Sequence, residues 1–97
     1  MRFLDISTFS QCLNQVFHVD IGSCEVRMTL VDMKRHPVVQ FPGIAREPFS
    51  LIFKSDNQVI LPQKIYTMSH DSIGKAGIFI VPVGRDAGGI IYEAVFN

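Results

Sequence analysis

The last third of the sequence places two strongly apolar segments on either side of a glycine-rich turn. Residues 78–81 lead into the turn at residues 83–89, and residues 90–97 lead out of it. Two apolar segments joined in this way are typical of an antiparallel β-hairpin. We therefore expect the end of the chain to belong to a β-sheet core.

Alternating hydrophobicity marks further strands upstream of this hairpin. Cys24, Val26, Met28 and Leu30 alternate with polar residues, which is the pattern of a strand with one buried face and one solvated face. Similar alternation occurs at residues 19–21, 49–53 and 65–70, and Gly22-Ser23 favours a hairpin between the first two strands. Six or seven strands at intervals of about 10–12 residues predict a mainly β fold, a small antiparallel barrel or sandwich.

One helix is expected near the N-terminus. Over residues 8–17 the apolar side chains recur at helical spacing, and the set comprises Phe9, Cys12, Leu13, Val16 and Phe17. A helix of two to three turns is not stable alone, so it must pack its apolar stripe on the sheet. Residues 1–97 are expected to form a single domain with one core.

Two segments have poor strand character. Residues 34–43 contain Pro37 and Pro42, and we expect a surface excursion there, with room for a short strand at residues 38–41. Residues 59–63 are apolar but interrupted by Pro62, which predicts an edge or a corner.

Composition argues against several kinds of partner. Nine basic and nine acidic residues are scattered along the chain, whereas nucleic-acid binders concentrate positive charge. Cys12 and Cys24 have no metal-binding spacing, so we expect no metal and no cofactor. No apolar run approaches the length of a membrane span and no signal peptide is apparent, which predicts a cytoplasmic protein with reduced thiols and no membrane partner.

No set of residues identifies a reaction. Cys12 could act as a nucleophile with His18 or His70, but it lies on the apolar stripe of the expected helix, where cysteine usually serves as a small hydrophobe. Tyr66 and His70 lie four residues apart, an arrangement better explained by packing and by a strand-terminating hydrogen bond than by acid–base catalysis. The glycines of residues 84–89 join two strands, unlike phosphate-binding loops, which lead into a helix. We expect a protein that is not an enzyme.

Several segments resemble a family of small bacterial domains of unknown function. They are Phe49-Ser50-Leu51-Ile52-Phe53, Leu61-Pro62-Gln63 followed by Tyr66 and His70, residues 81–86, and Tyr92-Glu93-Ala94-Val95-Phe96-Asn97. Lys64 stands where that family's corner has a glycine, and a lysine at positive φ would cost about 1 kcal/mol unless the corner is built differently. Such domains are associated with phage-tail-collar-like proteins, so the resemblance implies a part in a phage-derived or surface-associated assembly.

These observations favour a non-enzymatic protein-interaction or assembly module. The expected contact residues are Val31, Lys34, Arg35, Phe41, Ile52, Arg85 and Asp86. The partner is another protein, and a homodimer formed by edge strands is a further expectation. The alternative is a barrel that binds a small apolar ligand, with some of the eight phenylalanines lining a pocket and Tyr66 or His70 as the polar anchor.

Overall fold

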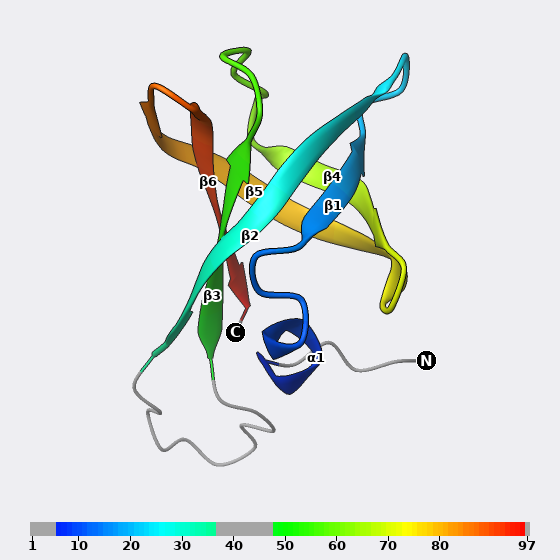
Figure 1. The fold of residues 1–97 in the computed structure, drawn as a ribbon, viewed down its shortest axis with the longest axis vertical. Helices are drawn as coiled ribbons and strands as arrows, with labels where there is room; N and C mark the ends of the chain where they lie inside the picture. The colour runs from blue at the N-terminus through cyan, green and yellow to red at the C-terminus, as the bar shows by residue number, and fades with distance from the viewer. Residues whose placement is uncertain (1–5, 37–47, 97) are drawn as a thin grey trace.

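A computed structural model describes residues 6–36 and 48–96. Figure 1 shows a strongly curved sheet with one short helix at its lower end. The elements in chain order are α1 (Ile6–Ser10), β1 (Val16–Asp20), β2 (Glu25–Arg35), β3 (Phe49–Ser55), β4 (Lys64–His70), β5 (Gly74–Asp86) and β6 (Gly89–Phe96). In the part of the chain that the structure describes, no helix has the length and hydrophobicity needed to span a bilayer.

The six strands of these described segments form a closed antiparallel barrel in the order β1-β2-β3-β6-β5-β4. Closure depends on the pairing of β1 with β4, in which His18 lies opposite Ser69 and Asp20 opposite Thr67. The expected mainly β fold with one short helix is confirmed, and of the two architectures it is the barrel. Closure leaves no strand without a neighbour on either side, which removes the long unpaired edges of an open sheet.

Apolar side chains from all six strands occupy the interior. The largest fully buried ones are Tyr92, Phe9, Phe17, Phe49, Phe53, Met28, Leu30, Leu51, Met68, Ile80, Ile90 and Val19. Phe9 of α1 lies against the rings of Phe17, Phe49 and Phe96, with ring centroids 5.5–6.4 Å apart. These three rings belong to the start of β1, the start of β3 and the end of β6, so α1 covers that end of the barrel.

The predicted helix over residues 8–17 is wrong in length and position. Helix α1 is only five residues long, and Val16 and Phe17 belong to β1. Asn14 has a φ of 66°, a left-handed conformation that stops helical winding. Its backbone N–H donates to the carbonyl of Leu30 in β2, so tertiary pairing replaces the helical bond. Leu13 is consequently 40% exposed, although it lies on the expected apolar stripe.

Two strands are longer than the sequence indicates. The expected surface excursion at residues 34–43 is wrong at its start, because Lys34 and Arg35 continue β2 and pair with Ser50 and Phe49. The remaining positions, with the suggested strand at residues 38–41, lie outside the described residues. The terminal hairpin is confirmed, but its turn is shorter than predicted, since β5 extends to Asp86.

Cys24 is a further correction. It precedes β2 and is exposed, whereas the alternation placed it with Val26 and Met28 on the buried face. Only the later inward residues of that pattern, Met28 and Leu30, are fully buried. The pattern fails at Cys24 because the β1–β2 turn already includes it.

Two tyrosine hydroxyls hold the corner at residues 59–62. The buried backbone N–H of Leu61 donates to the Tyr92 hydroxyl at 3.0 Å, and that hydroxyl lies 3.4 Å from the carbonyl of Val59. The Tyr66 hydroxyl donates to the carbonyl of Pro62 at 2.6 Å. An irregular segment has no strand partner for its polar backbone groups, so these side chains supply the hydrogen bonds that a ladder would otherwise give.

Lys64 does not carry the strain considered for that position. It is the first residue of the extended strand β4, and Asn14 is the one described non-glycine residue with positive φ. The Lys64 ammonium lies 5.1 Å from the centre of the Tyr66 ring, which is a favourable cation–π distance. The corner is therefore built without a glycine at this position.

We predict that Tyr92→Phe lowers the free energy of unfolding by about 1–3 kcal/mol, because the buried N–H of Leu61 then lacks an acceptor. Tyr66→Phe is the matched control, since it removes one hydroxyl from the same corner. The freed carbonyl of Pro62 belongs to an exposed residue and can bind water, so the loss should be only about 0.5–1.5 kcal/mol.

Urea unfolding followed by circular dichroism measures both values. Equal losses in the two variants would show that the burial of the Leu61 N–H is not what gives the Tyr92 bond its importance.

Candidate functional site

The expected contact residues lie on two separate parts of the barrel. Val31 and Ile52 are on neighbouring strands, with Val31 39% exposed at a bulge in β2 and Ile52 half-buried on β3. Lys34 and Arg35 lie further along β2, near the end covered by α1. Phe41 lies outside the described residues. The structure thus brings together Val31, Ile52 and Lys34 on the β2–β3 surface.

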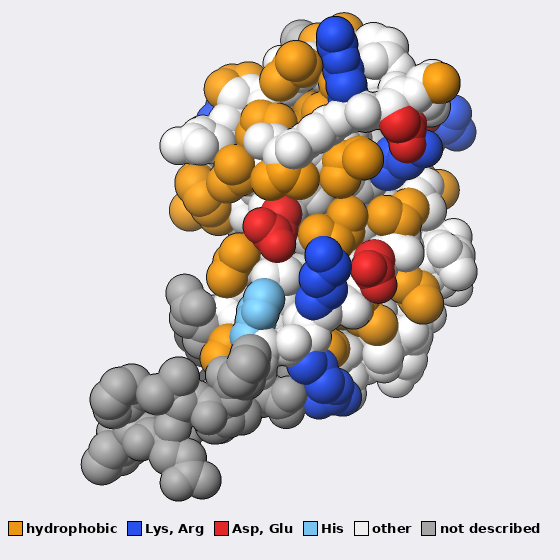
Figure 2. Space-filling model, turned by 90° about the vertical axis from the view of Figure 1, so that its left-hand side faces the viewer, with side chains coloured by type: hydrophobic (Ala, Val, Ile, Leu, Met, Phe, Trp, Pro, Cys, Tyr) orange, Lys and Arg blue, Asp and Glu red, His pale blue; other side chains and the backbone are white. Residues whose placement is uncertain are grey.

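Arg85 and Asp86 lie at the opposite end of the barrel, where β5 and β6 turn. We call this the mouth end, since the β1–β2 turn, the β3–β4 corner and the β5–β6 turn all lie there. Figure 2 shows one face of the molecule, on which hydrophobic side chains cover much of the upper part with acidic and basic side chains among them.

The side chain of Asp86, an expected contact residue, makes hydrogen bonds within the chain. Its carboxylate accepts hydrogen bonds from Lys54 Nζ at 2.9 Å and from the backbone N–H of Gly88 at 2.8 Å. These hydrogen bonds, with that from Lys54 the larger influence, lower the pKa of Asp86 below the ordinary aspartate value. The carboxylate therefore fixes the turn and neutralises Lys54.

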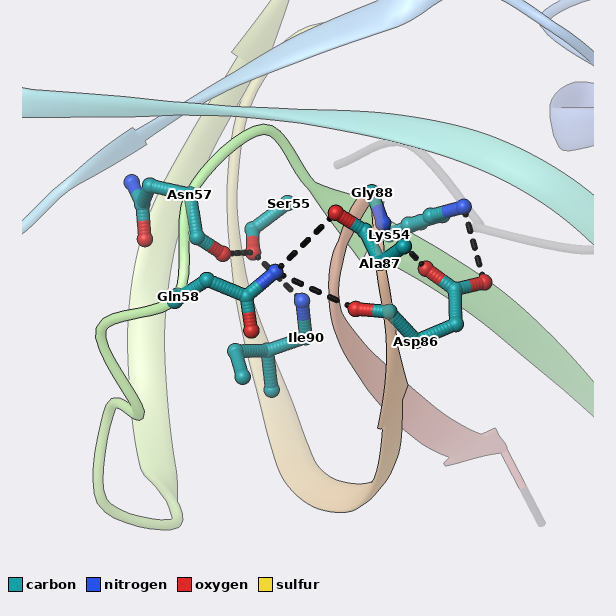
Figure 3. A network of polar contacts seen from close by, with 8 residues as sticks. All are labelled: Lys54, Ser55, Asn57, Gln58, Asp86, Ala87, Gly88 and Ile90. Atoms are coloured by element: carbon teal, nitrogen blue, oxygen red, sulfur yellow. Dashed lines mark hydrogen bonds and ion pairs between the residues drawn. The ribbon is translucent and has the colours of Figure 1, made fainter.

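A second set of bonds joins the β3–β4 corner to this turn (Figure 3). The side-chain amide of Gln58 donates to the carbonyls of Asp86 and Ala87 at 3.1 and 3.4 Å. The Ser55 hydroxyl accepts the backbone N–H of Ile90 and donates to the carbonyl of Asn57. Two loops from different parts of the sequence are therefore held as one unit.

Gly89 permits the close approach of these loops. A Cβ atom at this position would lie 1.9 Å from the carbonyl oxygen of Ser55, closer than any non-bonded contact allows. The loops could not meet in this way with any other residue at position 89, since every other residue has a Cβ.

Beside this unit is an open apolar groove of about 330 Å³. We call it the mouth groove, and it is lined by Ile60, Pro82, Gly84, Arg85 and Ile90. Ile60 comes from the corner, Ile90 from β6 and the other three from β5. Arg85 is its only charged lining residue, and the guanidinium has no ion pair or hydrogen bond with a described residue.

An exposed apolar row on the outside of the barrel was not predicted from the sequence. Ile65 of β4 lies directly opposite Phe79 of β5, and Val95 is an exposed residue near the end of β6. These three side chains are 66%, 48% and 52% exposed, and we call them the outer apolar row. The signal was the unbroken apolar run at residues 78–81, since a barrel strand with one solvated face should alternate.

Cys12 and His70 are close together, which is the arrangement that a nucleophilic Cys12 paired with His70 would need. Cys12 Sγ lies 3.7 Å from His70 Nδ1, and His70 Nε2 lies 2.6 Å from Gln15 Oε1. The backbone N–H of Ser72 already donates to Nδ1 at 3.0 Å, so the neutral ring carries its proton on Nε2 and donates to Gln15. Burial raises the pKa of the Cys12 thiol, the opposite of what a nucleophile needs. The cluster therefore ties the segment between α1 and β1, and the β4–β5 turn, to β4.

The lowered pKa of Asp86 gives a prediction with a definite sign. The charged form is favoured in the folded state, so its stabilising effect is complete above the ordinary aspartate pKa of about 4 and is lost as the pH falls through the lowered value. We expect Asp86→Asn to lower the melting temperature at neutral pH and the gap to wild type to close in acid, as followed by thermal unfolding over a pH series.

Lys54→Met provides the control, because it removes the main partner of Asp86. In that background Asp86→Asn should have a smaller effect at neutral pH. A gap that stays constant from neutral to acidic pH would contradict the assignment.

One protein-family model matches nearly all of the chain. Residues 4–96 match the model of a domain of unknown function, DUF6916. Comparison with curated proteins and with solved structures gives no match. The family agrees with the expected resemblance to an uncharacterised small domain, and the chain belongs to the DUF6916 family.

Proposed function

We propose that this domain is a non-enzymatic protein-interaction module that contacts another protein through the outside of its barrel. The observation that carries the proposal is the outer apolar row of Ile65, Phe79 and Val95. Single exposed hydrophobic residues are normal on protein surfaces, whereas contiguous ones mark interaction sites. Covering this row with a partner would remove apolar area from water at a gain of about 25 cal/mol per Å².

The chemistry of the described residues supports a binding role rather than a catalytic one. The thiol next to a histidine is buried and its pKa is raised, which disfavours nucleophilic attack. In the segments that the structure describes, no cluster of three His, Cys, Asp or Glu side chains suits a metal ion.

The alternative of an internal apolar ligand has less support. The inward side chains of all six strands are buried against one another, including the large rings of Phe17, Phe53 and Tyr92. Small barrels are usually filled by their own side chains in this way. The expected polar anchors, Tyr66 and His70, are already engaged with Pro62 and with Gln15 and Ser72.

Two finer parts of the proposal depend on the sequence alone. An accessory role beside a phage-tail-like protein follows from the family resemblance. The β2–β3 surface with Val31, Ile52 and Lys34 is a second contact region that follows from the same sequence reasoning.

We predict that a tagged form of the domain retains a stoichiometric protein partner from its host lysate and that Phe79→Ser abolishes this retention. Loss of the central apolar contact of an interface typically costs more than 1 kcal/mol of binding free energy, which lowers retention at least fivefold. Mass spectrometry of the bound fraction and light scattering of the purified domain distinguish a different protein from a second copy.

Val16→Ser is the matched control, because Val16 is exposed to a similar degree but lies on β1, away from the row. Val31→Ser tests the β2–β3 surface in the same experiment. If wild type retains no partner and stays monomeric at high concentration, the proposal fails. If Val16→Ser is as damaging as Phe79→Ser, the outer apolar row is not the interface.

A further inference from the structure

We propose that the mouth groove binds an extended segment of the partner protein in which a bulky apolar side chain is followed by an aspartate or glutamate. This inference rests on the proposed function as an interaction module and adds a second, more specific contact site. It depends on the lining, the charge, the backbone geometry and the rigidity of the groove.

The lining of the groove selects an apolar side chain. Ile60 is 57% exposed and Pro82 is half-buried, so these two side chains provide the accessible aliphatic surface, and Gly84 adds no side chain to the lining. No atom outside residues 83–85 lies within 4 Å of the position that a Cβ on Gly84 would occupy, so there is open space above it. At about 330 Å³ the groove can hold one large aromatic or aliphatic side chain.

Charge selects the neighbouring carboxylate. Lys54 and Asp86 form an ion pair at 2.9 Å and largely cancel each other. Arg85, which lines the groove, has no such partner among residues 6–36 and 48–96, so the lining contributes one positive charge that is not neutralised by a described residue. A guanidinium presents a planar pair of donors to a carboxylate, which adds geometric selectivity to the attraction.

The backbone of β5 favours an extended segment over a compact ligand. Ladder pairing with β4 ends at Lys64 opposite Ile80, whereas β5 continues to Asp86. Because Ile90 donates its N–H to Ser55 Oγ, the Arg85–Ile90 pair is of the non-hydrogen-bonded kind, and the polar backbone groups of Arg85 are directed away from β6. They are therefore directed to the side on which an incoming segment would lie.

The same strand limits the length of the contact. Pro82 has no N–H to offer, and the register shifts between Pro82 and Gly84. Proline and bulges are the devices by which proteins prevent uncontrolled strand addition at an edge. The groove thus accepts a short segment of two or three residues rather than a full strand.

Hydrogen bonds between the corner and the turn hold the walls of the groove in place before a ligand binds. Gln58 bonds to the carbonyls of Asp86 and Ala87, and Ser55 bonds to the N–H of Ile90, so the corner and the turn cannot move apart freely. A preformed site avoids the entropic cost of ordering two loops when the ligand arrives.

The test uses the full chain labelled with nitrogen-15 and two probe peptides, acetyl-Ser-Phe-Asp-Ser-amide and its isosteric control acetyl-Ser-Phe-Asn-Ser-amide. We expect saturable amide shift changes at Ile60, Gly84, Arg85 and Ile90 with the acidic probe at millimolar concentration. The control peptide and the Arg85→Gln variant should each weaken binding about fivefold to tenfold, since a charge-assisted hydrogen bond is lost.

Lys75→Gln is the matched control for charge, because Lys75 lies at the far end of the same strand. Ile60→Ser tests the apolar lining, and Ile65→Ser is its control, since Ile65 is a similarly exposed isoleucine on the outer apolar row. The amide spectrum of each variant verifies that it is folded before the titration.

Absence of saturable shifts at the groove, or equal weakening by Arg85→Gln and Lys75→Gln, would overturn the inference. The pull-down separates this failure from that of the proposed function. If the host partner is lost with Phe79→Ser but retained by Arg85→Gln and Ile60→Ser, the module stands and the groove is not its contact. If wild type retains no partner, the proposed function itself fails.

Discussion

The fold depends on how the chain passes from β3 to β4 without a regular ladder. The buried N–H of Leu61 has no strand partner, and it is satisfied by the hydroxyl of Tyr92 on β6. Tyr66 holds the next carbonyl from the other side. The bond to Tyr92 joins residues 31 positions apart in sequence, so the corner is fixed only once β6 is in place. They also give a physical reason for the Leu-Pro and Tyr residues that carry the sequence resemblance.

The two ends of the barrel are closed by different means. At one end Phe9 fills the opening with aromatic contacts, and the polar contacts of His70 tie the turns around it. At the mouth end, hydrogen bonds from Gln58 and Ser55 hold two loops together without covering the surface beside them. The apolar plug at one end excludes water, whereas the polar brace at the mouth end leaves Ile60 and Arg85 of the mouth groove exposed.

The strands were predictable because their hydrophobic alternation is local, as in the buried set Phe49, Leu51 and Phe53. Closure was not, because the pairing of β1 with β4 depends on residues some fifty positions apart. The helix was overextended because Leu13 and Val16 fit a 3.6-residue period, while Asn14 pairs with Leu30. At the candidate site, Arg85 and its exposure could be anticipated from the turn, but the partner of Asp86 is Lys54, on a different strand.

The outer apolar row can be separated from ordinary strand composition. β-branched and aromatic residues stabilise strands even where they are exposed, which accounts for isolated residues such as Val16 and Val31. Ile65 and Phe79 are direct cross-strand neighbours, and such a pair contributes up to about 1 kcal/mol within the sheet. The fold already buries a core and pairs all six described strands, so it does not depend on this contribution from an exposed pair. Ile65 and Phe79 are nevertheless a contiguous exposed pair, and the partner surface that we propose would remove their apolar area from water.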